Sequence, residues 1–303
     1  MSRRKRRKKK KSRKKLVYGV IVVIFVLLCL ATYSYLKLLN HNPPNSHPSD
    51  QLSNKAAIVD HLGFREETKN ETFKNSSIDM LEKSGFNVTY YPGEGVTIDF
   101  YRNLVSRNYG LIVFRVHSAI ILGLGNNESL GFFTSQLENE SWYELTSPYY
   151  NDFANSRIVR GYFQEDPATY YFAVAPGFIK KYGNFQNTII IIMGCDGLKY
   201  NIMAEAFIGT KAKVCIGWNG LVGAPHTDHA TTRLLQHLTQ GNTVEEAVDK
   251  TMDEVGPDQE YESVLTYYPK NAGGYIIQLT LGISGMETLR TNPVLVKKET
   301  RLN

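Results

Sequence analysis

Cysteine is scarce in this chain, with three residues among 303. Cys29 lies in a long apolar segment, which leaves only Cys195 and Cys215 for the remainder of the sequence. Two thiols cannot supply the disulfide framework that is typical of small secreted domains. Cys215 lies in a short β-type run, and we expect it to be a small buried apolar residue.

Two motifs that could bind a nucleotide or a metal are incomplete in this sequence. The glycines Gly123 and Gly125 are followed by no third glycine and no lysine at the spacing of a phosphate-binding loop. His226 and His229 have the spacing of a metal-ligand pair but lack an adjacent acidic cluster, so we expect them at a helix start capped by Thr227 or Asp228. We therefore expect no cofactor and no metal.

Charge is distributed unevenly at the amino end. Residues 3–15 contain twelve Lys or Arg and no acid, and the 21 residues from Leu16 to Leu36 carry no charge. Such a segment is long enough to span a bilayer and too long for the core of a cleaved signal peptide. The positive-inside rule then predicts a cytoplasmic tail (1–15), a transmembrane helix (16–36) and an extracellular carboxyl-terminal domain, hence a single-pass cell-membrane protein with a signal anchor.

The folded part is mildly acidic once the tail is set aside. Removing residues 1–15 takes away twelve of 35 basic residues and none of 29 acids, which leaves 23 − 29 = −6. The basic block is thus explained by topology and by anionic lipid, and nucleic acid is not an expected partner.

Residues 37–54 are rich in Pro, Asn and Ser and predict a linker, followed by one domain (55–290) and a tail (291–303). Extracellular exposure is compatible with glycosylation, as in a glycoprotein. Five sequons are present, at Asn70, Asn75, Asn87, Asn127 and Asn139.

From Lys55 onward, strand and helix signals alternate, which predicts an α/β fold with a mostly parallel sheet. Residues 119–187 interrupt the alternation as an insertion, with a hairpin candidate at 120–133 and an aromatic, irregular stretch at 142–182. The expected strands are 55–60, 87–91, the runs ending at His117 and Cys195, 214–218, and an edge strand at 274–281. The expected helices are 76–84, 97–107, 200–208, 229–238 and 244–255.

Two apolar runs end on reactive side chains, namely Leu111-Ile-Val-Phe-Arg-Val-His117 and Thr188-Ile-Ile-Ile-Ile-Met-Gly-Cys195. The carboxyl ends of parallel strands meet at one edge of the sheet, so this histidine and cysteine can form a base and a thiol nucleophile. We expect the N-terminus of the next helix and a neighbouring imidazolium to lower the pKa of the thiol. In the alternative interpretation, His117 is a strand-end histidine bonded to a loop and Cys195 is a buried thiol.

Several segments together resemble the CHAT-domain branch of the caspase-like cysteine peptidases, a fold shared with separases, gingipains and legumains. The similarity covers residues 55–256 and is strongest from 188 to 250. Ile192-Met-Gly-Cys-Asp-Gly197 is especially similar to the cysteine motif of separases. The other segments are the strand ending in His117, Met203-Ala-Glu-Ala-Phe207, Lys213-Val-Cys-Ile-Gly-Trp218 and the run from Asp228 to Gly241 with Glu246 and Ala247.

The resemblance implies a caspase-like three-layer sandwich with Cys195 as nucleophile and His117 as general base and acid. It also implies an oxyanion hole from the backbone N–H groups of Cys195 and Ser118, although the family usually has glycine at the latter position and a Cβ there can hinder the backbone. Gly194, where the family commonly has alanine, is expected to matter less. An acid often holds a basic substrate residue in related enzymes, and Asp60 and Asp196 are both open candidates.

The sequence thus predicts a membrane-anchored extracellular cysteine endopeptidase, a hydrolase acting on a peptide or protein substrate. A second hypothesis belongs to another class, an inactive caspase-like ectodomain that serves as a binding or sensing module. The sequence does not determine the substrate, the activation mechanism or the oligomeric state.

Overall fold

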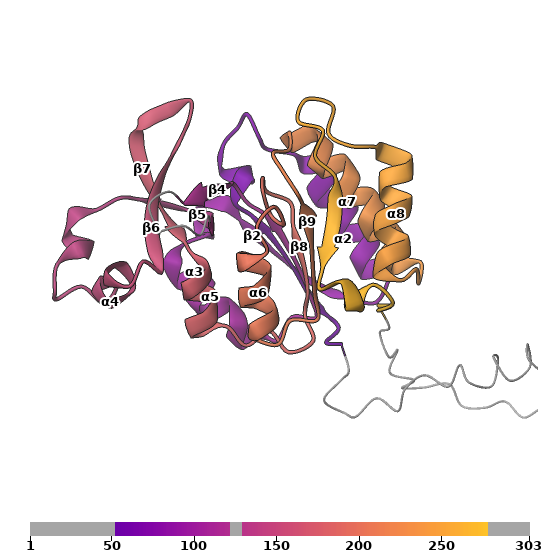
Figure 1. The fold of residues 1–303 in the computed structure, drawn as a ribbon, viewed down its shortest axis with the longest axis horizontal. Coiled ribbons are helices and arrows are strands. Elements are labelled where there is room, and N and C mark those ends of the chain that lie inside the picture. The colour runs from indigo at the N-terminus through magenta and orange to yellow at the C-terminus, as the bar shows by residue number, and fades with distance from the viewer. Residues whose placement is uncertain (1–51, 122–128, 278–303) are drawn as a thin grey trace, which may run out of the picture. The chain divides into compact units, whose positions relative to one another are not determined.

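The computed structural model describes residues 52–121 and 129–277. Their core is a six-stranded central sheet in the order β10-β9-β8-β3-β1-β2, parallel except for β10. The expected α/β class with a mostly parallel sheet is therefore confirmed (Figure 1). The strands are β1 (Lys55–Asp60), β2 (Asn87–Pro92), β3 (Leu111–Arg115), β8 (Ile189–Ile192), β9 (Val214–Trp218) and β10 (Leu265–Tyr268).

Helices cover both faces of the central sheet, which explains why its inner strands are continuous apolar runs. Alternate strand residues join two separate cores, so that Ile112 and Phe114 lie in one and Leu111 and Val113 in the other. One face carries α2 (Glu71–Lys83), α7 (Ala224–Thr239) and α8 (Val244–Val255), and the other carries α3 (Ile98–Leu104), α5 (Pro176–Tyr182) and α6 (Ile202–Gly209) (Figure 1).

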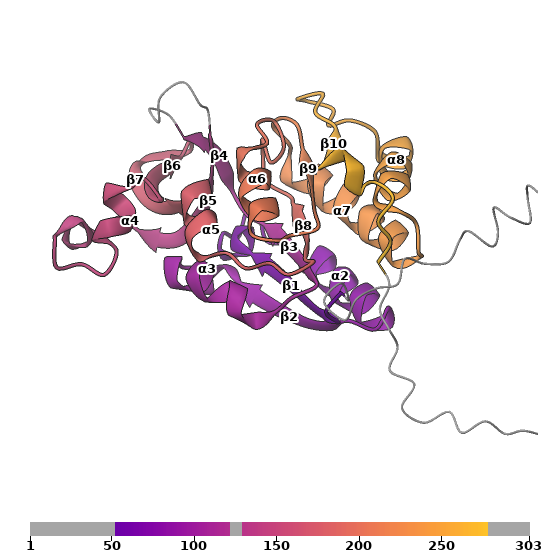
Figure 2. The same cartoon turned by 60° about the horizontal axis from the view of Figure 1, so that its bottom comes forward.

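The segment between β3 and β8 forms a second sheet of four antiparallel strands in the order β4-β5-β7-β6. Figure 2 shows this sheet beside the helices α3 and α5, at the end of the molecule that also carries α4 (Tyr150–Ala154). The hairpin predicted at 120–133 corresponds to the antiparallel pair β4 and β5. The irregular stretch predicted at 142–182 is wrong, because it contains β6, β7, α4 and α5. The strands are β4 (Ser118–Ile121), β5 (Ser129–Leu137), β6 (Ile158–Phe163) and β7 (Asp166–Val174).

The starts of α2 and α7 and the position of the edge strand differ most from the predictions. Helix α2 begins at Glu71, where the Asn70 side chain accepts a hydrogen bond from Phe73 N–H. Helix α7 begins at Ala224, with Gly223 as N-cap and a proline in its first turn, so the predicted cap at Thr227 or Asp228 is wrong. The antiparallel edge strand is β10 and not 274–281, of which residues 278–281 lie outside the described residues.

No helix within residues 52–121 and 129–277 has the length and apolar character needed to cross a bilayer. The predicted transmembrane helix at 16–36 lies outside the described residues, as do the basic tail at 1–15 and the carboxyl-terminal tail at 291–303.

Candidate active site

His117 lies two residues beyond the end of β3, in the short connection to β4. Its backbone N–H donates to Nδ1 of the buried His61 at 3.4 Å. Its imidazole packs against two rings of the second sheet, with centroids 4.6 Å from Phe133 and 4.8 Å from Phe163. The histidine is therefore positioned by both sheets.

Cys195 lies three residues beyond the end of β8, the parallel neighbour of β3. Its Sγ lies 3.5 Å from both the backbone nitrogen and the backbone oxygen of Val222, in the loop that follows β9. That loop is held by the Ser263 hydroxyl, which donates to the Leu221 carbonyl at 2.5 Å. Within the described residues, the thiol thus hydrogen-bonds to Val222 and not to the imidazole.

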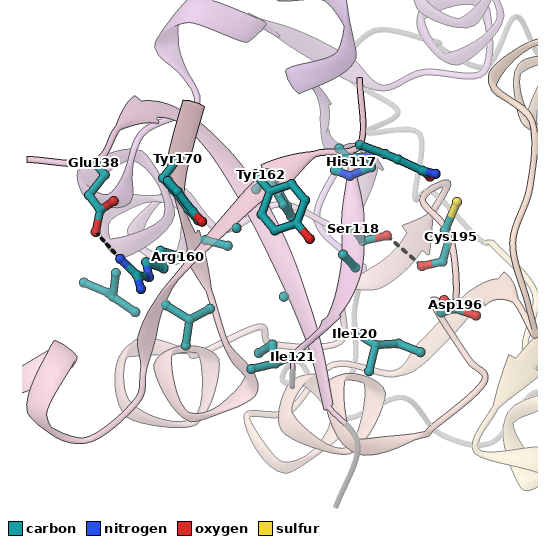
Figure 3. A pocket seen from close by; sticks show the side chains of 18 of the residues that line it. His117, Ser118, Ile120, Ile121, Glu138, Arg160, Tyr162, Tyr170, Cys195 and Asp196 are labelled. Atoms are coloured by element: carbon teal, nitrogen blue, oxygen red, sulfur yellow. Dashed lines mark hydrogen bonds and ion pairs between the residues drawn. The ribbon is translucent and has the colours of Figure 1, made fainter. Parts of the chain in front are cut away.

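The two reactive side chains lie in one groove. His117, Ser118, Cys195 and Asp196 all line a groove of about 1590 Å³ that extends over the second sheet. Figure 3 shows Cys195 and Asp196 at one end of it and His117 beside them. The sheet topology accounts for this placement, because β3 and β8 are adjacent and parallel and therefore end at the same edge.

Burial keeps both groups neutral near pH 7. It lowers the pKa of His117 to about 4, with the Arg65 charge acting in the same direction and the Glu165 charge opposing it. It raises the pKa of the Cys195 thiol, which the Asp196 charge raises further, while the Val222 N–H acts against it. The predicted lowering of the thiol pKa is wrong, because α6 begins only at Ile202 and the imidazole carries no charge.

Ser118 forms the first residue of β4. The Phe133 N–H donates to the His117 carbonyl at 3.0 Å, which makes Ser118 and Phe132 a non-hydrogen-bonded pair of the antiparallel ladder. The Ser118 hydroxyl donates to the Cys195 carbonyl at 2.7 Å. The side chain therefore fixes the cysteine loop, while its backbone N–H forms no ladder bond to β5.

Gly194 makes room for that serine. A Cβ at this position would come within 2.2 Å of the Ser118 Oγ and 2.5 Å of the Val116 carbonyl oxygen. The second contact is with backbone, which cannot move aside without shifting β3. In this chain, where serine occupies position 118, glycine is therefore required at 194.

The structure separates the two candidate substrate acids. Asp196 lines the groove, has a left-handed backbone (φ 57°) and lies 3.5 Å from the Lys199 ammonium. Asp60 is buried elsewhere, where its carboxylate accepts from the Arg115 guanidinium at 2.7 Å and from the Tyr90 hydroxyl at 2.8 Å. Asp60 is absent from the groove lining.

Arg115 forms a buried ion-pair network at the carboxyl edge of the central sheet, next to the candidate site. Its guanidinium is 1% exposed, and it binds Asp60 and, through two nitrogens at 2.7 and 2.8 Å, Asp228 of α7. A third acceptor is the Thr68 carbonyl at 2.6 Å. This network connects the ends of β1 and β3 to α7, two residues before the histidine. A charged residue inside an apolar run was the sequence signal for it, because a buried guanidinium requires anionic partners.

His61 and Val222 are the site residues that the sequence did not indicate. Burial and the neighbouring His117 lower the pKa of His61 to about 3, so its Nδ1 stays an acceptor for the His117 N–H. Val222 acts through its backbone alone, so that its side-chain type carries no signal. Both contacts join segments that are remote in sequence.

Residues 52–121 and 129–277 contain no group of three or more ligating side chains placed to hold a metal. No family model matches the chain, and no curated protein matches it either.

Proposed function

We propose that this chain is a cysteine peptidase of the caspase-like, CHAT-domain type, held at the cell surface by residues 16–36. One observation carries the proposal: His117 and Cys195 leave adjacent parallel strands and line the same groove. The N–H groups of Ser118 and Cys195 adjoin that pair and are suited to bind a developing oxyanion.

In the proposed reaction, the neutral imidazole of His117 removes the thiol proton as Sγ attacks the scissile carbonyl carbon. The oxyanion accepts hydrogen bonds from the two backbone N–H groups. Collapse breaks the C–N bond, the His117 imidazolium protonates the leaving amine, and a thioester remains on Cys195. Water, deprotonated by His117, then hydrolyses the thioester and regenerates the thiol.

For the attack, the Cys195 thiol must leave its hydrogen bonds to Val222 and form one to the His117 imidazole. The two bonds to Val222 are weak, because sulfur is a poor donor and acceptor, and rotation about the Cys195 Cα–Cβ bond is sufficient to break them. A proton shuttle that starts from neutral partners avoids burying an ion pair in the empty site, a costly arrangement.

The second candidate is the inactive binding or sensing module. It is favoured by the raised pKa of the thiol and by the bonds that hold Sγ on Val222. The two candidates share the fold and differ only in whether a substrate is acylated.

The test is cleavage of a library of short peptides with basic, acidic or amide residues before the scissile bond, by the full-length protein in detergent. We expect turnover that is lost in both Cys195→Ala and His117→Ala. Cys215→Ala is the matched control, since that thiol is fully buried in another layer of the core and should be dispensable.

A thioester trapped by rapid acid quench and seen by mass spectrometry, on Cys195 and on no other residue, provides direct support. Absence of cleavage and of acylation across the library, or cleavage retained by Cys195→Ala, would reject the peptidase and leave the binding module.

A further inference from the structure

The groove continues far beyond the reactive pair and is lined by residues from both faces of the second sheet. One face of that sheet packs into the core through Phe132 and Phe172, and Arg160 and Tyr162 lie on this same face at its exposed end. Four small residues, one on each strand, share the other face of the sheet with Phe133 and also line the groove. These residues are Ala119 (β4), Gly131 (β5), Gly161 (β6) and Ala173 (β7).

One close approach explains the glycine on β6. A Cβ on Gly161 would come within 2.4 Å of the Phe133 ring, the same ring that supports the His117 imidazole. The Phe133 ring therefore packs on Gly161 on one side and supports the His117 imidazole on the other.

The position of the imidazole determines in which direction a peptide substrate would run along the groove. His117 packs against Phe133 and Phe163 and so lies between Cys195 and the second sheet, as Figure 3 shows with Glu138, Arg160 and Tyr170 at the far end. In thiol-dependent amide cleavage, the imidazolium protonates the leaving nitrogen. The leaving nitrogen must then lie on the side of the second sheet, and the residues that follow it run over that sheet.

The walls of the groove carry negative charge and aromatic faces. Glu138, Glu140 and Glu165 line it against a single guanidinium, Arg160, which is already paired with Glu138 at 3.3 Å. Tyr143 and Tyr162 also line it, with 39% and 49% of their surfaces exposed. Carboxylates next to tyrosine rings favour a lysine or arginine side chain, which gains both an ion pair and a cation–π contact.

We propose that the groove over the second sheet binds the leaving-group side of an extended polypeptide substrate and favours lysine or arginine in that segment. This inference rests on the proposed peptidase function, and it adds where the substrate lies, in which direction it runs and what charge it carries beyond the scissile bond.

Acylation separates this side of the substrate from the other. When the C–N bond breaks, the amine product leaves with the proton of His117, and the thioester holds only the residues before the bond. Substrates that differ only after the scissile bond therefore share one acyl-enzyme and one hydrolysis step. Any difference in kcat/KM among them arises from binding and acylation on the leaving-group side.

The test uses internally quenched peptides that share the best acyl-side sequence from the library and carry Lys-Lys, Ala-Ala or Glu-Glu at the third and fourth positions after the scissile bond. We expect kcat/KM to be about three- to tenfold higher for Lys-Lys than for Ala-Ala, and lower still for Glu-Glu. The variant Glu138→Gln/Glu165→Gln should reduce this preference to less than about twofold. The matched control Glu66→Gln/Glu82→Gln removes two exposed carboxylates outside the groove and should retain it.

A second measurement does not depend on turnover. Fluorescein-labelled Ala-Ala-Lys-Lys and Ala-Ala-Glu-Glu amides mimic the free amine products, and their binding to Cys195→Ala is followed by anisotropy. We expect the lysine peptide to bind more tightly, in a manner that depends on Glu138 and Glu165. Equal kcat/KM for the three substrates with thioester still forming on Cys195 would overturn this inference alone, whereas failure of every peptide to acylate Cys195 would overturn the proposed function and this inference with it.

Discussion

The resting thiol of Cys195 is expected to react slowly with iodoacetamide at neutral pH, although we propose it as a nucleophile. Its reactivity follows from the thiolate fraction, and burial and the Asp196 charge both lower that fraction. Removing the histidine by His117→Ala should leave the alkylation rate of the unliganded protein nearly unchanged, because the imidazole is neutral and does not bond to the sulfur.

The magnitudes follow from the two pKa values. A thiol with the ordinary pKa of 9.0 is ionised to about one part in a hundred at pH 7, and the raised pKa of Cys195 places it below that fraction. A histidine with a pKa of about 4 is protonated to about one part in a thousand at pH 7. The thiolate–imidazolium pair is therefore a negligible species in the empty site.

The assay is alkylation of the full-length protein in a Cys29→Ser/Cys215→Ala background between pH 6 and 10, with a cysteine peptide as reference. We expect the rate to be lower than that of the reference at every neutral pH and to rise with pH without a plateau up to at least pH 9. A plateau of fast alkylation near pH 7 that disappears in His117→Ala would show a preformed ion pair and refute this reasoning.

Three further predictions concern stability. Arg115→Met leaves two buried aspartates without their cation and should lower the free energy of unfolding by about 3 to 5 kcal/mol in urea titrations, whereas Lys83→Met, which breaks an exposed helical ion pair, should cost less than about 1 kcal/mol. Gly194→Ala should destabilise the fold by more than about 1 kcal/mol and should not be rescued by Ser118→Gly, because its contact with a backbone oxygen remains; thermal unfolding of the single and double variants measures this. The pKa of His61 falls from 6.5 to about 3 on folding, so its contribution to stability is complete above pH 6.5 and is lost as the pH falls toward 3; in His61→Leu, chemical unfolding between pH 7 and 4 should therefore show a smaller loss of stability than in the wild type.

The central sheet could be predicted from the sequence because both of its faces are covered. Covered strands are continuous apolar runs, and the runs at 111–117 and 188–195 also locate the carboxyl edge. The positions of the helix starts were harder to predict from the sequence. Helix α7 begins with Ala-Pro after Gly223, and a glycine cap that uses no side chain leaves little sequence signal.

The second sheet escaped prediction for a physical reason that is connected with the groove. Strand β6 contains Arg160, Gly161 and Tyr162 and thus lacks apolar alternation, since Arg160 and Tyr162 are exposed where they line the groove. Strand β7 begins with Asp166 and Pro167, residues that indicate a turn. A prediction based on apolar alternation therefore misses both strands.

Because Cys195 and His117 are both neutral, slow alkylation of the thiol does not by itself indicate an inactive protein. A cysteine that is buried and bonded to Val222 fails a reactivity screen whether it belongs to a peptidase or to an inactive module, so alkylation alone does not distinguish the two. Turnover does, because in the proposed reaction the imidazole acts only when a substrate carbonyl is present to receive the thiolate. The informative comparison is therefore His117→Ala in both assays. If that variant alkylates like the wild type and yet forms no thioester, the histidine functions as a base during attack, and the groove beside it is where a substrate must lie.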